Sequence, residues 1–158
     1  MPKVAFIGAG GAAWTLALSR DILSAPELQD TLFSLTDIDP DRLEITRSAL
    51  QREIDGHDIS AEVTATTDRR EALKDADYII NAVRIGGMEM WRADVEIPLT
   101  YGVDQCIGDT LGPGGIMYGQ RSIPAVLEFC RDIRDVNANG LADWYELIQP
   151  GAQYKVQP

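Results

Sequence analysis

The sequence predicts an α/β domain built on a doubly wound, mainly parallel β-sheet. Three observations lead to this prediction. Residues 3–18 (KVAFIGAGGAAWTLAL) join a short apolar run to a cluster of glycines and then to a helical pattern. Strand-like and helix-like segments alternate as far as residue 83, which is typical of parallel sheets with right-handed crossovers. The length of 158 residues fits one domain of ordinary size.

The first strand and helix are expected within residues 3–24. Residues 3–8 form an apolar run that ends in glycine, as in a strand buried on both faces. From Ala12 to Ser24 apolar residues recur near the helical period, and Pro26 lies where that helix should have ended. These signals place a glycine-rich turn between a strand and a helix.

Two further strands are predicted around a helix with a clear start signal. Residues 31–39 (TLFSLTDID) predict the second strand, which ends in acidic residues. The helix that follows is favoured because Asp39 can cap it and Pro40 suits its first turn. Residues 61–68 (AEVTATTD) alternate and are rich in Thr and Val, which predicts the third strand.

The pattern continues to residue 83 and then changes. A brief helix over 68–76 and an apolar strand over 77–83 are predicted next. Residues 84–124 hold many glycines with polar side chains among them, which favours a loop-rich site region over a simple sheet crossover. Helical periodicity returns over residues 122–136.

Composition argues against several classes of protein. The net charge of −11 disfavours nucleic-acid binding, which needs clustered Lys and Arg. No apolar run approaches the roughly 20 residues of a membrane span, and no secretory leader is recognised at the N-terminus, so we expect a cytoplasmic protein without a membrane partner. Two cysteines, Cys106 and Cys130, are too few for a disulfide framework.

Residues 8–13 (GAGGAA) fit G-x-G-x-x-A, a permitted form of the fingerprint of Rossmann-like dinucleotide-binding domains. Gly8 permits the tight turn, and Gly10 lets the backbone approach a pyrophosphate. Gly11 belongs to the same turn, and Ala13 keeps the next helix close to the sheet, where its N-terminus favours phosphate. The alternative is a glycine-rich turn without a ligand.

An acidic residue at the end of the second strand supports the dinucleotide hypothesis. A carboxylate at Asp37 would accept the ribose hydroxyls of NAD and repel the extra phosphate of NADP. No arginine follows it directly, which favours NAD as the cofactor. Alternatively, the Asp-Ile-Asp-Pro segment only caps the next helix, a task for which Asp39 is the better candidate.

Four segments of the chain resemble the N-terminal part of glycoside hydrolase family 4, and most of all its α-galactosidase (melibiase) branch. They are FIGAGG, LTDIDPDRLE, TTDRREALKDADYIINAVRIGG and EIPLTYGVDQCIGDTLGPGGIMYGQRSIP. The most specific is residues 107–124, with GDTLGPGGI at its centre. On this basis we expect an NAD-binding domain over residues 1–134 and a divergent tail, not a domain, over 135–158.

The resemblance implies a hydrolase of α-galactosides that uses NAD⁺ and a divalent metal, commonly Mn²⁺, in place of paired carboxylates. The implied chemistry is oxidation of the C3 hydroxyl by NAD⁺, loss of the C2 proton, elimination of the aglycone, addition of water and return of the hydride. The partner would be a small-molecule glycoside, and full-length relatives are expected to be homo-oligomers.

The same resemblance suggests which residues meet the ligands. The glycine-rich turn and Asp37 would hold NAD, Asn81 would lie beside the nicotinamide half, and Asp109 and Thr110 would face the sugar. For Asp109 a turn-forming role is the alternative.

The metal ligands and the catalytic base of the family would follow an Asn-Pro turn that we do not find here, so the catalytic residues stay unassigned. We therefore expect no glycosidase turnover by this chain alone. A truncated or frameshifted gene product, or a genuine short relative, would each explain such a sequence.

Residues 135–146 (DVNANGLADWYE) match the spacing of a calcium-binding loop. The ligand positions would be taken by Asp135, Asn137, Asn139, Asp143 and Glu146. The alternative, an Asn/Gly-rich turn and a short amphipathic tail, is preferred, because Pro150 would end the exit helix after about one turn and no partner loop is evident.

Two rival functions remain open. One is a non-catalytic NAD-binding or subunit-interaction module. The other is a hydroxy-acid dehydrogenase, which is disfavoured because the only histidine, His57, lies between the second helix and the third strand instead of after the fourth.

Overall fold

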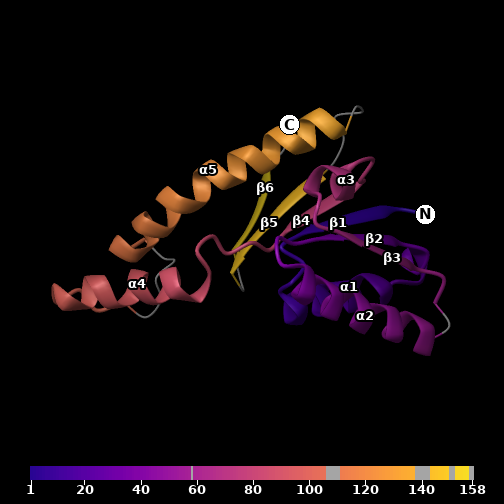
Figure 1. Ribbon diagram of the computed structural model, residues 1–158, viewed down its shortest axis with the longest axis horizontal. Helices are drawn as coiled ribbons and strands as arrows, with labels where there is room; N and C mark the ends of the chain where they lie inside the picture. The colour runs from indigo at the N-terminus through magenta and orange to yellow at the C-terminus, as the bar shows by residue number, and fades with distance from the viewer. Residues whose placement is uncertain (58, 106–110, 138–142, 150–151, 157–158) are drawn as a thin grey trace. The chain divides into compact units, whose positions relative to one another are not determined.

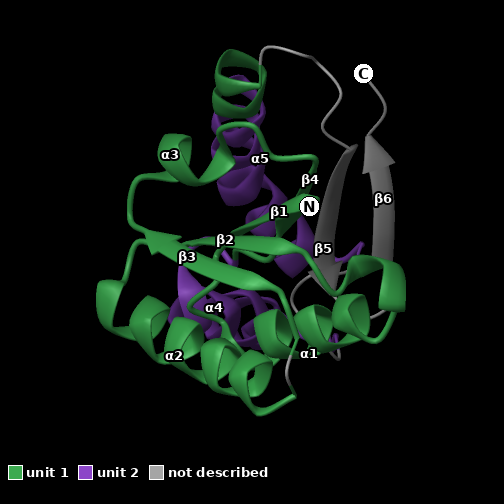
Figure 2. Cartoon of the chain, turned by 90° about the vertical axis from the view of Figure 1, so that its right-hand side faces the viewer, with its two compact units in different colours: residues 1–83, 132–158 green, residues 84–131 purple. Residues whose placement is uncertain are grey.

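The computed structural model describes residues 1–57, 59–105 and 111–137, together with the backbone of 143–149 and 152–156. Their contacts divide the chain into two units. Unit 1 comprises residues 1–83 and 132–158, and unit 2 comprises residues 84–131 (Figure 2).

A six-stranded sheet forms the framework of unit 1, with the strand order β3-β2-β1-β4-β5-β6 (Figure 1). The first five strands in this order are parallel, and β6 runs antiparallel to β5. This arrangement confirms the doubly wound, mainly parallel sheet predicted from the sequence. The strands are β1 Lys3–Ile7, β2 Leu32–Thr36, β3 Glu62–Thr66, β4 Tyr78–Asn81, β5 Asp143–Gln149 and β6 Ala152–Val156.

The register brings three strand ends to one edge of the sheet. Ile7, the last residue of β1, pairs with Thr36 at the end of β2 and with Asn81 at the end of β4. The residues that follow these strands, among them Gly8 and Asp37, are therefore neighbours although they are far apart in the sequence.

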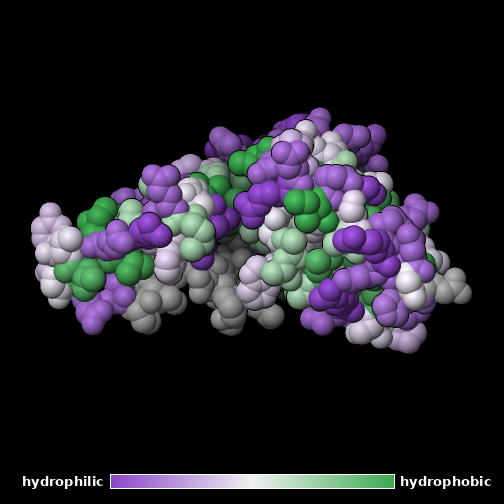
Figure 3. Space-filling view, turned by 60° about the horizontal axis from the view of Figure 1, so that its bottom comes forward, coloured by the Kyte–Doolittle hydropathy of each residue, from purple (hydrophilic) through white to green (hydrophobic). Residues whose placement is uncertain are grey.

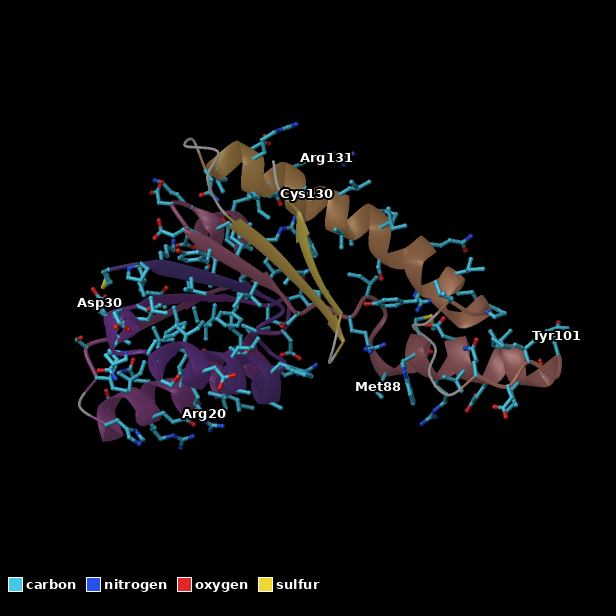
Figure 4. All side chains as sticks on the ribbon, turned by 180° about the vertical axis from the view of Figure 1, so that it is seen from behind. Arg20, Asp30, Met88, Tyr101, Cys130 and Arg131 are labelled. Carbon is cyan, nitrogen blue, oxygen red and sulfur yellow. The ribbon has the colours of Figure 1, made fainter. Side chains whose placement is uncertain are left out.

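Three helices of unit 1 cover the two faces of its sheet. Helices α1 (Ala12–Leu23) and α2 (Pro40–Gly56) lie on one face, and α3 (Arg69–Leu73) lies on the other (Figure 2). Arg20 of α1 reaches α2, where its Nε donates to Glu53 at 2.9 Å (Figure 4). Helices on both faces bury both sides of the central strands, as their continuous apolar sequences require.

The core of unit 1 lies between the sheet and helices α1 and α2. Phe6 of β1 and Phe33 of β2 are fully buried, with ring centroids 6.3 Å apart. Leu50 and Ile54 of α2 complete the same cluster. Burial of each such side chain contributes roughly 1.5–3 kcal/mol to the free energy of unfolding. This packing therefore stabilises the ends of β1 and β2, which Gly8 and Asp37 follow.

Capping explains where two of these helices begin. The Asp39 carboxylate accepts hydrogen bonds from the backbone N–H groups of Asp41 and Arg42, both at 3.1 Å, at the start of α2. Asp68 caps α3 in the same way. The prediction that Asp39 caps the second helix is therefore confirmed, and Asp37 is free of that task.

The prediction of a loop-rich region over residues 84–124 was wrong for most of its length. Helix α4 spans Gly87–Thr100, and α5 spans Pro113–Val136, so α5 begins well before the helix expected from residue 122. Gly86 precedes α4 at φ +85°, a conformation that favours glycine. Each interior glycine costs a helix roughly 1 kcal/mol, and packing overrides that penalty here.

The polar centre of unit 2 joins these two helices. Asp94 of α4 is 1 % exposed, and its carboxylate accepts hydrogen bonds from both terminal nitrogens of Arg121 on α5, at 2.8 and 2.5 Å. The hydrogen bond to Asp94 raises the pKa of Arg121 above its ordinary value. The Gln105 amide donates to the Asp94 carbonyl at 2.8 Å and accepts from the Gly114 N–H at 3.3 Å. The pair and the amide together fix α4 against the start of α5.

Residues 143–156, expected to be a turn and a tail, contain two strands. Strand β5 pairs with the free edge of β4, and β6 pairs with β5. The proposed boundary at residue 134 stays a prediction.

The surface is mixed in character. On the face shown in Figure 3, hydrophilic side chains are interspersed with small apolar groups. In the part of the chain that the structure describes, no helix has both the length and the apolar character needed to cross a bilayer.

One acidic residue links α3 to the end of α5 within unit 1. Asp132 accepts hydrogen bonds from Arg69 Nε at 2.8 Å and from Arg70 Nη1 at 2.7 Å. Burial by itself would raise the pKa of Asp132, but the hydrogen bonds from the two arginines outweigh it and the pKa lies below the ordinary 3.8. The folded state therefore favours the ionised carboxyl.

Replacing Asp132 with asparagine is expected to lower the free energy of unfolding by about 1 kcal/mol at pH 7. Because the folded-state pKa is depressed, this contribution is complete above the unfolded pKa of about 3.9 and is lost as the pH falls through the folded value. Urea unfolding at pH 7 and pH 3 measures the difference between the two proteins. Asp21→Asn, on the exposed face of α1, is the control. An equal difference at both pH values would contradict the prediction.

Candidate cofactor-binding site

The candidate site lies where the strand order of the sheet reverses. The chain moves outward from β1 to β2 and β3, and then returns to place β4 on the other side of β1. In open α/β sheets, ligands bind outside the carboxyl ends of the strands at such a switch point. Gly8 follows β1 there, and the N–H of Ala82, after β4, donates to the Ile7 carbonyl at 2.9 Å.

Main-chain hydrogen bonds hold the glycine-rich turn to the end of β2. The N–H groups of Gly8 and Ala9 both donate to the Thr36 carbonyl, at 2.9 and 3.0 Å. From within α1, the buried Thr15 hydroxyl donates to the Ala9 carbonyl at 3.1 Å. The turn is thus fixed from both sides before any ligand binds.

Backbone conformation explains the first glycine of the motif. Gly8 has φ +86°, in the left-handed region that favours glycine. A Cβ atom at this position would lie 2.8 Å from Val83 Cγ2 and 3.1 Å from the carbonyl carbon of Ala82. The prediction that Gly8 permits the tight turn is consistent with both observations.

Asp37 lies against the same turn. Its Oδ2 accepts a hydrogen bond from the Gly10 N–H at 2.7 Å, and its Oδ1 accepts one from the Asp39 N–H at 3.0 Å. A carboxylate can accept about four hydrogen bonds, so capacity for ribose hydroxyls remains. The structure brings Asp37 and the glycine-rich turn together, as the hypothesis of a shared site requires.

The N-terminus of α1 differs from those of α2 and α3. Its N-cap residue is Gly11, and no side chain caps the helix. The first N–H groups of a helix need partners from outside, and their positive end attracts anions. A phosphate at this position would supply what Asp39 and Asp68 supply to the other two helices.

Asn81 lies at the end of β4 and is 2 % exposed. Its Oδ1 accepts a hydrogen bond from the Val83 N–H at 3.2 Å, which shapes the segment that follows the strand. Its predicted place beside a nicotinamide stays a prediction.

The sequence did not point to two residues that hold this turn, Thr36 through its carbonyl and Thr15 through its hydroxyl, nor to Val83, whose side chain limits the space at Gly8. Thr15 could have been found, because it is a hydroxyl residue only one helical turn after Gly11. Thr36 acts through its backbone and leaves no signal in its side chain.

Only some of the remaining predicted positions fall on residues that the structure describes. Asp109, Thr110 and Asn139 lie outside the described residues.

The other residues of the predicted calcium loop belong to two different elements. Asp135 is in the last turn of α5, and its carboxylate lies 3.7 Å from Arg70 Nη1. Asn137 directly follows that helix. Asp143 and Glu146 are residues of β5. No group of three or more His, Cys, Asp or Glu side chains within the described ranges is arranged to hold a metal ion. The calcium-loop assignment and the two sugar contacts remain predictions.

Comparisons with known proteins agree with the geometry. The sequence profile of the family 4 glycosyl hydrolases matches residues 3–142. The α-galactosidase of Rhizobium meliloti (strain 1021) is 53 % identical over 138 residues, which cover 87 % of this chain and 28 % of that protein. The α-galactosidase of Bacillus subtilis (strain 168) is 36 % identical over 137 residues, covering 86 % of this chain and 32 % of that protein.

A solved structure gives the same result for the fold. The 6-phospho-β-glucosidase of Thermotoga maritima, in a structure with manganese, NAD⁺ and glucose-6-phosphate, is similar with a TM-score of 0.82 at 26 % identity. The similarity covers 95 % of this chain and 35 % of that one. The chain thus spans about a third of the length of these relatives, or less. With the match over residues 3–142 and the relatives above, the chain belongs to the family 4 glycosyl hydrolases.

Proposed function

We propose that residues 8–13 and Asp37 bind NAD⁺, and that the chain forms the cofactor-binding domain of an NAD-dependent glycosidase of the α-galactosidase type. The observation that carries the proposal is the fixed glycine-rich turn at the switch point of the sheet, which presents an uncapped helix N-terminus beside a carboxylate. Both groups suit a dinucleotide.

The residues present fit NAD⁺. The N-terminus of α1 would meet the pyrophosphate, and Asp37 would accept the hydroxyls of the adenosine ribose. When bound, NAD⁺ supplies a hydride acceptor for oxidation of the sugar. This chain's own residues orient the cofactor, and the buried Asn81 shapes the neighbouring segment after β4.

Similarity to two α-galactosidases supports the assignment of a substrate class. Both α-galactosidases named above are similar to this chain, at 53 % and 36 % identity. We therefore propose an α-galactoside as the small-molecule substrate, a cytoplasmic location, a homo-oligomeric full-length enzyme and manganese as its metal. Manganese accompanies NAD⁺ in the Thermotoga maritima structure, and its ligands are not assigned here.

Calorimetric titration tests the cofactor site directly. The 158-residue chain is expected to bind NAD⁺, and NADP⁺ about tenfold more weakly or worse, since the Asp37 carboxylate repels the additional phosphate. Ala12→Asp is expected to weaken NAD⁺ binding about tenfold, because it places a negative charge at the first turn of α1. The same charge suits a helix N-terminus, so thermal stability should not fall.

The matched control is Ala17→Asp, which adds the same charge to an exposed position farther along α1. It should leave the affinity for NAD⁺ unchanged. If Ala12→Asp and the wild type bind NAD⁺ equally well, the pyrophosphate does not lie at this helix end. If the wild type binds no NAD⁺, the proposed function fails.

Turnover is measured separately, as release of 4-nitrophenol from its α-galactoside with NAD⁺ and Mn²⁺ present. From the sequence, we expect cofactor binding without turnover by this chain alone. Release that depends on both NAD⁺ and Mn²⁺ would contradict that expectation and show that the chain is an enzyme by itself.

A further inference from the structure

The Asp37 carboxylate also holds the backbone of the glycine-rich turn, in addition to its proposed contact with the ribose. Its two oxygens accept backbone hydrogen bonds from two different loops: Gly10 of the β1–α1 turn at 2.7 Å and Asp39 of the β2–α2 loop at 3.0 Å. The charge is therefore part of the turn's own structure. Hydrogen bonds to a charged acceptor are about twice as strong as neutral ones, so this contact constrains the turn strongly.

Available space, and not backbone conformation, restricts position 10. Gly10 does not have a positive φ, so an alanine could adopt its backbone angles. A Cβ atom there would nevertheless lie 2.7 Å from Asp37 Oδ2 and 3.2 Å from Arg42 Cβ. At the next position, Gly11, the nearest atom to such a Cβ is 3.5 Å away. The Asp37 carboxylate thus occupies the space that a side chain at position 10 would need.

We propose that Asp37 is a positioning residue of the turn: its carboxylate, seated where residue 10 lacks a side chain, holds the Gly10 N–H in the conformation that the cofactor requires. This inference rests on the proposed NAD⁺ site and adds a second role to the ribose contact. It has a specific consequence for cofactor preference. Removing the Asp37 charge removes both the repulsion of NADP⁺ and the hydrogen bond that holds Gly10, so NADP⁺ should not gain affinity.

The first test needs no cofactor. In Asp37→Asn, a single uncharged oxygen remains for two N–H groups, those of Gly10 and Asp39, so exchange of the Gly10 amide, followed by NMR, should accelerate about tenfold or more. Thermal unfolding of a double-mutant cycle gives a second readout. Gly10→Ala should lower Tm by about 5 °C in the wild type and by clearly less in an Asp37→Ala background, where the obstructing carboxylate is gone.

The second test measures both cofactors on folded Asp37→Asn. Affinity for NAD⁺ should fall about tenfold or more, and affinity for NADP⁺ should not rise, since both need the same turn. Asp39→Ser is the matched control: it removes one negative charge two residues away and keeps a good capping side chain for α2. It should leave Gly10 exchange and NAD⁺ affinity unchanged.

Three results would overturn the proposal. A rise in NADP⁺ affinity with unchanged Gly10 exchange would make Asp37 a discriminating residue only. A lower Tm with unchanged affinities for both cofactors would make its role purely structural. Equal effects of Gly10→Ala in the two backgrounds would show that the carboxylate does not restrict position 10. If the wild type binds neither cofactor, the proposed function fails, while amide exchange and the cycle still decide whether Asp37 holds the turn.

Discussion

Replacing Arg121 with methionine is expected to destabilise unit 2 by about 3–5 kcal/mol. The substitution leaves the Asp94 carboxylate, 1 % exposed, without the two hydrogen bonds that it accepts from the guanidinium. A buried charge that loses its partner keeps the full cost of its desolvation. The measurements are urea unfolding and hydrogen exchange of the α4 and α5 amides, which reports this unit separately.

Arg131→Met is the matched control, because it is the same substitution on an exposed residue of the same helix (Figure 4). It should change the free energy of unfolding by no more than about 0.5 kcal/mol. The double variant Asp94→Leu with Arg121→Met should recover much of the loss, because apolar replacements leave no charge unpaired. If Arg121→Met were as stable as Arg131→Met, the pair would not hold α4 to α5.

Replacing Gly8 with alanine is expected to cost about 2–4 kcal/mol of unfolding free energy and to abolish measurable NAD⁺ binding. Two effects add at this position. The backbone has φ +86°, and the new methyl group would lie 2.8 Å from Val83 Cγ2 and 3.1 Å from the Ala82 carbonyl carbon. The main chain directly after β4 cannot move aside cheaply, so the turn itself must shift. Thermal unfolding and calorimetric titration measure the two losses.

Gly56→Ala is the control for this substitution. Gly56 is the last residue of α2, and no atom lies within 4 Å of a Cβ added there. Its alanine variant should be as stable as the wild type or slightly more so, because alanine favours a helix. Combining Gly8→Ala with Val83→Ala should recover only part of the loss, since the backbone strain and the Ala82 contact remain. Full recovery would show that only the Val83 side chain opposes the methyl group.

Local signals in the sequence were enough for the first four strands, because each is a short apolar or alternating run followed by turn residues. The start of α2 was predictable for the same reason, since Asp39 and Pro40 act on the backbone next to them. The region over residues 84–124 was misread because its many glycines lower helix propensity. Helices α4 and α5 are joined by the pairing of Asp94 with Arg121, which are 27 positions apart, so no short segment carries this signal.

At the candidate site, too, features within one short segment were predictable and contacts between distant segments were not. The spacing of Gly8 and Gly10 after an apolar run identified the turn from one short segment. The contact between Gly10 and Asp37 also joins residues 27 positions apart, and it depends on the register of β1 against β2. Strands β5 and β6 were not predicted because residues 143–149 do not alternate and the alternating run over 152–156 is only five residues long, and because the edge of β4 supplies the pairing partner of β5.

The hydrogen bonds of the glycine-rich turn have a consequence for the order of events during synthesis on the ribosome. The hydrogen-bond partners of the turn described above, Thr15, Thr36 and Asp37, are all translated before α2 begins. The turn can thus form while the rest of the chain is still being made, since none of these partners has to wait for a later segment. Strand β1, in contrast, keeps one open hydrogen-bonding edge until residues 78–81 emerge. We expect this exposed edge of β1 to be the part of the nascent domain that most needs chaperone protection.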